Sequence, residues 1–193
     1  MPADRRDLEA RLAAATPDDT VRGLIFNAVF SVVSEALGDA AARACDPSGK
    51  GGRIDFFTHP VADFLRTCWD AADLLEPALG GPESAFFRIG HRALAVVAGS
   101  ILGKTLLALA GGGPQQLLLN APGGYRGTVS YGERTAEAIG DRHVRLVFRR
   151  DFLVPSFHCG VLTAAAEITG GRAVRAEGRQ TGFLEASYDV TWE

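Results

Sequence analysis

The stretch Leu184-Glu185-Ala186-Ser187-Tyr188-Asp189-Val190-Thr191-Trp192 decides the fold class of this chain. Its odd members, counted from Leu184, are all apolar, and the residues between them are all polar. A strict period of two predicts an antiparallel strand with one face on a core and the other in water. The C-terminus is therefore expected to belong to a sheet that is half covered by other elements.

The elements before this strand follow from the same reasoning. Residues 173–179 alternate more weakly and predict its hairpin partner. Residues 155–170 have helical spacing of apolar residues, with Pro155 at the start and Gly170-Gly171 at the end. Alternation at 129–131 and again at 144–148 predicts a first hairpin. The order is therefore strand, strand, helix, strand, strand.

The first 121 residues have the 3.6-residue period of helices. Glycine and proline clusters divide them into helices expected over residues 4–15, 26–37, 60–76, 82–103 and 115–120. The predicted fold is thus α+β, with an N-terminal helical layer packed on a four-stranded antiparallel sheet and a helix between the two C-terminal hairpins. We expect a single domain over residues 1–193, with residues 1–19 as a helical appendage.

Composition and charge limit where the protein works. A formal charge of −3, with both signs mixed along the chain, predicts no binding to nucleic acid. The most apolar run, residues 93–103, is about half the ~20 residues that span a bilayer, so no membrane span is expected. The N-terminus has no apolar stretch of signal-peptide length, and Cys45, Cys68 and Cys159 are an odd set typical of reduced thiols. These features predict a cytoplasmic protein.

One motif points toward an enzyme. The stretch Gly99-Ser100-Ile101-Leu102-Gly103-Lys104-Thr105 ends like a phosphate-binding loop, but it is one residue short between its glycines. The run before it has helical spacing, whereas a phosphate-binding loop follows a strand. We therefore interpret it as an ordinary helix end, and keep a nucleotide-dependent enzyme as the least favoured of three hypotheses.

No other motif predicts catalysis or metal binding. His158-Cys159 are neighbours on a helix, where successive side chains diverge by about 100°. We expect His158 on the helix surface and Cys159 packed inside. The remaining histidines lack the spacing of a metal site. We accordingly predict no catalytic residues, no metal ligands and no cofactor.

The polar face of the sheet allows two interpretations. His143, Arg145, Arg149, Arg175 and Arg179 would share it, which favours a strip for an acidic partner. Acidic residues on the same face, among them Asp189 and Glu177, favour internal ion pairs instead. We expect the salt-bridged, solvated face.

Five segments together resemble a myxobacterial paralogous family of unknown function. They are residues 21–26, 60–66, 130–133, 149–152 and 188–192, and the resemblance spans residues 20–193. The order of elements is also similar to the superfamily that includes four-vinyl-reductase-type domains, haem nitric-oxide-binding domains and TRAPP vesicle-tethering subunits. That resemblance implies helices on an antiparallel sheet, commonly around an apolar cavity.

Specific functions of that superfamily do not transfer to this sequence. The haem-binding members hold the porphyrin propionates with a Tyr-x-Ser-x-Arg signature. Here Tyr131-Gly132-Glu133-Arg134 lacks both the serine and the spacing. The resemblance therefore disfavours haem.

Our leading hypothesis is a non-enzymatic ligand-binding or regulatory module that takes a small apolar ligand and forms a homodimer. The residues expected at its cavity share large apolar side chains on central helices: Phe64, Cys68, Phe86, Ile89 and Phe157. The alternative is a protein-interaction module with no small-molecule ligand, whose sheet edge or helix face docks a protein partner.

Overall fold

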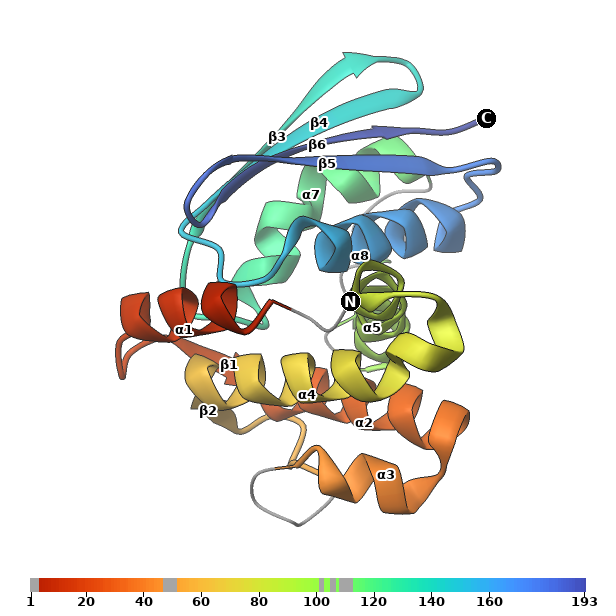
Figure 1. Ribbon diagram of the computed structural model, residues 1–193. Coiled ribbons are helices and arrows are strands. Elements are labelled where there is room, and N and C mark those ends of the chain that lie inside the picture. Colours follow the sequence, from red (N-terminus) through yellow and green to blue (C-terminus); the bar gives the residue numbers. More distant parts are fainter. Residues whose placement is uncertain (1–3, 47–51, 101–102, 105–106, 108–112) are drawn as a thin grey trace.

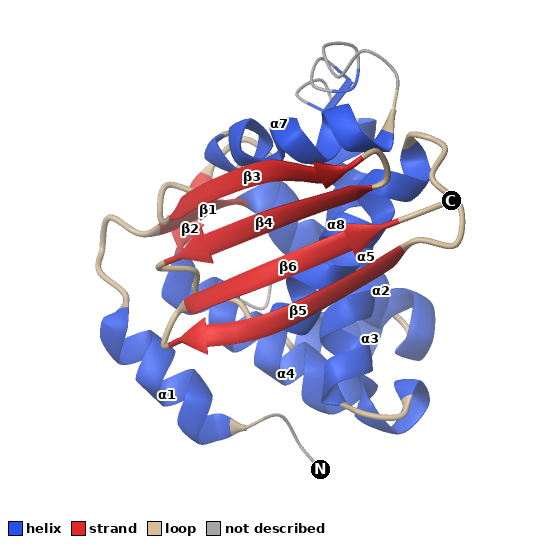
Figure 2. Cartoon of the chain, turned by 90° about the horizontal axis from the view of Figure 1, so that it is seen from above, coloured by secondary structure: helices blue, strands red, loops and turns tan. Residues whose placement is uncertain are grey.

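A four-stranded antiparallel sheet forms one side of the molecule in a computed structural model (Figures 1 and 2). The structure describes residues 4–46, 52–100, 103–104, 107 and 113–193. The strands are β3 (Glu133–Gly140), β4 (His143–Arg149), β5 (Arg175–Gly182) and β6 (Glu185–Thr191), in the order β3-β4-β6-β5. Helix α8 (Pro155–Ile168) connects the two hairpins. The expected α+β fold is confirmed.

The alternation in β6 has the predicted structural result. Ala186, Tyr188 and Val190 are buried, while Glu185 is exposed. β6 lies in the middle of the sheet, because it pairs with β4 on one side and β5 on the other. The buried residues of β4 and β6 pack on α8 and exclude water from one face of the sheet.

The opposite face of the sheet carries ion pairs. Asp189 accepts hydrogen bonds from His143 Nε2 at 2.6 Å and from Arg145 Nε at 3.1 Å across adjacent strands. Arg175 and Glu177 pair along β5. This agrees with the salt-bridged face expected from the sequence.

Helices fill the space below the sheet (Figure 1). They are α1 (Arg5–Ala14), α2 (Gly23–Leu37), α3 (Asp39–Ala44), α4 (Val61–Leu79), α5 (Pro82–Gly99) and α7 (Pro114–Arg126), with the short paired strands β1 (Thr20–Arg22) and β2 (Thr58–Pro60). α7 and α8 lie directly under the sheet, α5 lies under α8, and α2, α3 and α4 form the far layer. α8 and α5 are thus the middle of the molecule.

Helices α5 and α8 cross in backbone contact. A Cβ atom added at Gly90 would overlap the carbonyl oxygen of Phe157, and one added at Gly160 would overlap the carbonyl oxygen of Phe87. Each glycine therefore lies against the backbone of the other helix. Only a residue without a side chain permits this spacing.

Two helices extend beyond the ends predicted for them. α4 was expected to stop before Pro77 but continues to Leu79 and ends at Gly80, which has φ 81°. A proline in the last turn removes only one backbone donor, so the turn survives it. α7 was expected to end before Pro122, yet it runs through that residue to Arg126. Both predictions gave proline too much weight as a helix breaker.

The first strand of the sheet was predicted too early in the chain. Residues 129–131 do not pair with β4: Val129 forms a bridge with Val21 instead, and β3 begins at Glu133. The apolar side chains at 129 and 131 serve the helical core and not the sheet. Alternation correctly showed extended backbone there but gave the wrong partner.

Parts of the phosphate-loop-like stretch, at residues 101–102 and 105, lie outside the described residues. The residue before the stretch belongs to α5, as its helical spacing predicted. Among the described helices, none has both the length and the hydropathy needed to cross a membrane.

Candidate functional site

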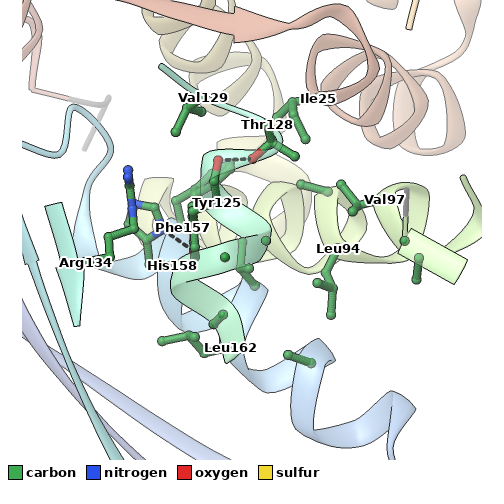
Figure 3. A pocket seen from close by; sticks show the side chains of 18 of the residues that line it. Ile25, Leu94, Val97, Tyr125, Thr128, Val129, Arg134, Phe157, His158 and Leu162 are labelled. Carbon is green, nitrogen blue, oxygen red and sulfur yellow. Dashed lines mark hydrogen bonds between the residues drawn. The ribbon is translucent and has the colours of Figure 1, made fainter. Parts of the chain in front are cut away.

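A cavity of about 350 Å³ lies between α5, α7, α8 and β1 (Figure 3). Most of its wall is aliphatic or aromatic. Its size is at the lower end of the range that small-molecule sites occupy. The main apolar side chains of the wall are Val21, Ile25, Phe64, Leu94, Val97, Leu117, Val129, Leu153, Phe157, Val161, Leu162 and Ala165.

Helical spacing produces two sides of this wall. On α8, Phe157, Val161 and Ala165 recur every fourth residue and so project from one face. On α5, Ala93 and Val97 have the same spacing. Because the two helices touch through glycine backbones nearby, their cavity-facing stripes are held at a fixed separation.

The residues predicted for the cavity divide into two groups. Phe64 and Phe157 lie in its wall, with ring centroids 6.3 Å apart. Cys68, Phe86 and Ile89 are outside that wall and are buried in the helical core. Phe86, for example, packs against Trp69 with ring centroids 4.8 Å apart. The structure thus brings together two of the five predicted residues at the cavity.

A chain of buried polar groups borders the cavity. The Asp151 carboxylate accepts hydrogen bonds from Arg134 Nη2, from His158 Nε2 at 2.8 Å and from the Leu153 amide at 3.1 Å. The other ring nitrogen, His158 Nδ1, is 2.8 Å from the Tyr125 hydroxyl. Side chains of Arg134 and Asp151 are each 4% exposed. Of these groups, Arg134, His158 and Tyr125 line the cavity (Figure 3).

The charges in this chain stabilise one another. Burial by itself would raise the pKa of the Asp151 carboxyl, but the nearby charges of His158 and Arg134, with hydrogen bonds from His158 and the Leu153 amide, lower it below its usual value. Asp151 is therefore ionised and balances Arg134. Burial raises the pKa of the Tyr125 phenol, which keeps its proton. The arrangement is a buried network in which the Asp151 carboxylate is the shared acceptor.

Aromatic rings enclose the guanidinium of Arg134. Its Cζ atom lies 4.5 Å from the centroid of Tyr125, 5.3 Å from Phe148 and 5.6 Å from Tyr131. Such contacts stabilise a desolvated cation. Arg134 Nε is buried and has no hydrogen-bond partner among the described residues.

The prediction for His158 was wrong. It was expected on the helix surface but is 2% exposed. Helical spacing could have predicted this burial. His158 lies three, four and seven residues before Val161, Leu162 and Ala165, which are on the buried face of α8. Asp151 and Tyr125 lie too far away in the sequence for spacing to link them to it. Cys159 is buried, as expected.

Metal ligation has no support in the part of the chain that the structure describes. No group of three or more histidine, cysteine, aspartate or glutamate side chains comes close enough there to hold an ion. The three cysteines are free and buried, and burial raises the pKa of the Cys68 thiol above its usual value. These thiols are therefore packed and protonated.

Comparisons with known proteins identify a family and a fold. A family model described as a protein of unknown function, DUF2378, matches residues 14–193. No curated protein matches the chain in sequence. Solved structures of H-NOX proteins are similar in fold, in agreement with the superfamily resemblance drawn from the sequence.

Three of these structures show the extent of the similarity. The Fe(II) unliganded H-NOX protein from K. algicida has a TM-score of 0.71 at 12% identity, over 89% of this chain and 96% of that one. An H-NOX mutant from S. oneidensis in the Fe(II) state has a TM-score of 0.71 at 11% identity, over 89% and 96%. A structure that probes haem distortion in the H-NOX family has a TM-score of 0.65 at 9% identity, over 89% and 95%. At such identities the likeness establishes the fold alone.

The residues of the cavity do not fit haem. Haem iron needs an axial ligand such as histidine, cysteine, methionine or tyrosinate. Among the described residues of the cavity wall, the histidine is His158, and both of its ring nitrogens are already hydrogen-bonded. Burial raises the pKa of Tyr131, which disfavours the phenolate that would bind iron. Arg134, the cation that propionates would require, is paired with Asp151.

Proposed function

We propose, from the premise that the chain belongs to the DUF2378 family of proteins of unknown function, that it is a sensory or regulatory module that binds a small apolar ligand. The cavity of about 350 Å³ with its aliphatic and aromatic wall carries this proposal. A mainly apolar space of this size favours an apolar occupant, because binding there removes the occupant's hydrophobic surface from water. The fold shared with H-NOX proteins, one of which is an oxygen-binding domain, supports the same class of function.

The protein works without catalysis in this proposal. In the described part of the chain, the titratable groups of the network beside the cavity bond to one another and place no nucleophile next to a free base. We further propose that residues 1–193 act as one domain, that the protein is cytoplasmic, and that its kinship is with the myxobacterial paralogous family. The N-terminal helix supports the first point, since Arg11 Nη1 donates to the Leu153 carbonyl, on a residue of the cavity wall, at 3.3 Å.

Replacing Val97 by tryptophan is expected to abolish ligand binding. Val97 is half-buried on α5 and projects toward the cavity, so an indole there would occupy the ligand's space (Figure 3). Native mass spectrometry of freshly purified protein should show a co-purifying mass on the wild type and none on Val97→Trp. Leu74→Trp is the matched control, because Leu74 is 39% exposed on α4 and is outside the cavity wall.

Two results would count against this function. A wild-type protein that carries no added mass, and that no apolar probe stabilises, would contradict a ligand-binding role. If Val97→Trp retains the co-purifying mass and Leu74→Trp loses it, the ligand binds in another part of the molecule.

A second candidate function is protein interaction through an apolar surface. Ile54, Phe56 and Phe57, just before β2, are 53%, 68% and 53% exposed. The two phenylalanine rings pack edge to face with centroids 5.0 Å apart, so they present a joint aromatic surface. We propose a second copy of the chain as its occupant, because a two-fold axis places such a patch against itself.

Substituting both phenylalanines tests the homodimer. Phe56→Ser with Phe57→Ser is expected to convert a dimer into a monomer in size-exclusion chromatography with light scattering. The double variant should keep its circular dichroism spectrum, because both rings are mainly exposed. A wild-type monomer, or a dimer that both substitutions leave intact, would reject this surface as the interface.

A further inference from the structure

Tyr131 lies in the wall of the cavity, and its hydroxyl makes no hydrogen bond with a described residue. Tyr131 is 5% exposed and belongs to the wall of the cavity. Its ring packs edge to face on Phe152, with centroids 4.9 Å apart, and the guanidinium of Arg134 lies over it. Among the described residues, none forms a hydrogen bond with this hydroxyl; Arg134 Nη1 donates to the backbone carbonyl of Tyr131 instead.

Backbone geometry fixes where this phenol lies. Gly132, the next residue, has φ 77°, a conformation that favours glycine, and a Cβ atom there would come within 2.9 Å of the Arg150 carbonyl oxygen. The bond from Arg134 to the Tyr131 carbonyl, at 2.8 Å, holds the turn from the other side. The ring is therefore held in place before any ligand arrives.

This phenol is a hydrogen-bond donor at all ordinary pH values. Burial, and then the negative charge of Asp151, raise its pKa well above the usual value, so it keeps its proton. A ligand that fills the cavity removes this hydroxyl from water, which costs free energy unless an oxygen atom on the ligand accepts its hydrogen bond. The Tyr131 hydroxyl is thus a point in the cavity at which an otherwise apolar molecule gains from a polar atom.

The charge balance of the wall determines which polar atom fits. Arg134 is the cation among the described wall residues, and Asp151 already balances it. A carboxylate buried in this cavity would have no free positive charge to meet, and burying an unpaired charge is costly. An uncharged oxygen meets no such penalty.

We infer that the ligand is an uncharged, mainly apolar molecule with a carbonyl or hydroxyl oxygen that accepts a hydrogen bond from Tyr131. This inference rests on the proposed function and specifies its ligand class. The apolar part lies against α5 and α8, and the oxygen lies at the Tyr131 end of the cavity. A long-chain ketone or a similar neutral lipid fragment has this chemistry.

Three probes of equal chain length test the inference on protein freed of bound lipid. Isothermal titration calorimetry at neutral pH would compare 2-decanone, decane and decanoate on the wild type, Tyr131→Phe and Tyr188→Phe. Tyr188 is the matched control because its phenol is also buried and has no hydrogen bond to a described residue, yet it lies outside this cavity. The space beside Tyr188 is only about 10 Å³, room for one water at most.

The expected pattern is selective. Tyr131→Phe should weaken 2-decanone binding about threefold to tenfold, the range of one neutral hydrogen bond, and leave decane within about twofold. Tyr188→Phe should change neither. Decanoate should bind the wild type on the order of tenfold or more weakly than 2-decanone. Unchanged decane binding also shows that Tyr131→Phe keeps the cavity intact.

Each other outcome has a definite meaning. If none of the three probes binds the wild type, the proposed function itself fails. If decane and 2-decanone bind but Tyr131→Phe affects them equally, the cavity is real and the role of Tyr131 is wrong. Decanoate as the tightest probe would overturn the uncharged ligand.

Discussion

Replacing Asp151 by alanine should lower the free energy of unfolding by about 3 to 5 kcal/mol. Asp151 is 3% exposed, and its carboxylate accepts hydrogen bonds from Arg134, His158 and the Leu153 amide. Its removal leaves a guanidinium buried without a counter-charge. Urea-induced unfolding, followed by circular dichroism, measures the loss.

The surface of the sheet supplies a matched control for this variant. Asp189 also accepts from one histidine and one arginine, but its side chain is 31% exposed. Asp189→Ala should therefore cost at most about 1 kcal/mol, because water solvates the remaining charges. Equal losses in the two variants would contradict the importance that we give to burial.

A double variant separates the charge from the packing. Asp151→Leu with Arg134→Met removes both charges of the pair and leaves apolar groups of similar size. Replacement of a whole buried ion pair is often close to neutral, so this variant should recover a large part of the stability lost in Asp151→Ala. No recovery at all would show that His158 and the Leu153 amide depend on the carboxylate more than Arg134 does.

The pH dependence of stability at acid pH should also show the contribution of the Asp151 carboxylate. Although burial raises the pKa of Asp151, the opposite charges around it lower it more, so its pKa in the folded protein is below that in the unfolded chain. A lowered pKa stabilises the fold above the unfolded value, near pH 4, and this contribution is lost as the pH falls further. The wild type should therefore lose stability more steeply than Asp151→Asn below about pH 4, as measured by unfolding at a series of pH values.

The second large effect is expected at the crossing of α5 and α8. Gly90→Ala should destabilise the fold by about 3 kcal/mol, because its Cβ atom would overlap the Phe157 carbonyl oxygen and the helices would have to separate. Thermal unfolding measures this as a lower midpoint. The cost comes from backbone displacement, which no side-chain rotation can relieve.

A second glycine of the same helix isolates that cause. A Cβ atom at Gly99 would meet nothing within 4 Å. Gly99→Ala should therefore be neutral or should stabilise by up to about 1 kcal/mol, since alanine favours the helix more than glycine does. Similar losses at positions 90 and 99 would mean that helix propensity, and not the crossing, determines the result.

Much of the fold followed from local periodicity. The alternation from Leu184 to Trp192 gave β6, and the stripe from Phe157 to Ile168 gave α8, because each pattern reflects burial on one face. Periodicity failed where local signals compete, as at Pro122, which the packed helix α7 tolerates. It also cannot say which element an extended segment joins, and Val129 pairs with Val21 for that reason.

The site was less accessible from the sequence. Large apolar residues on central helices were expected at the cavity, but size and burial are equally typical of solid core, where Cys68, Phe86 and Ile89 lie. The polar network joins Tyr125, Arg134, Asp151 and His158, which come from α7, β3, the segment before α8, and α8. Only tertiary structure brings these together. Among these four residues, only the burial of His158 could have been predicted from the helical period of the sequence.

The backbone contact between Gly90 and α8 also has a thermodynamic consequence for recognition. Two sides of the cavity are joined where neither helix can slide or separate without cost, so they behave as one preorganised surface. An incoming molecule then spends little free energy on ordering that surface, and its affinity depends on how well its shape already matches. Selectivity by rigid complementarity on the α5 and α8 sides of the cavity follows from two residues that have no side chain.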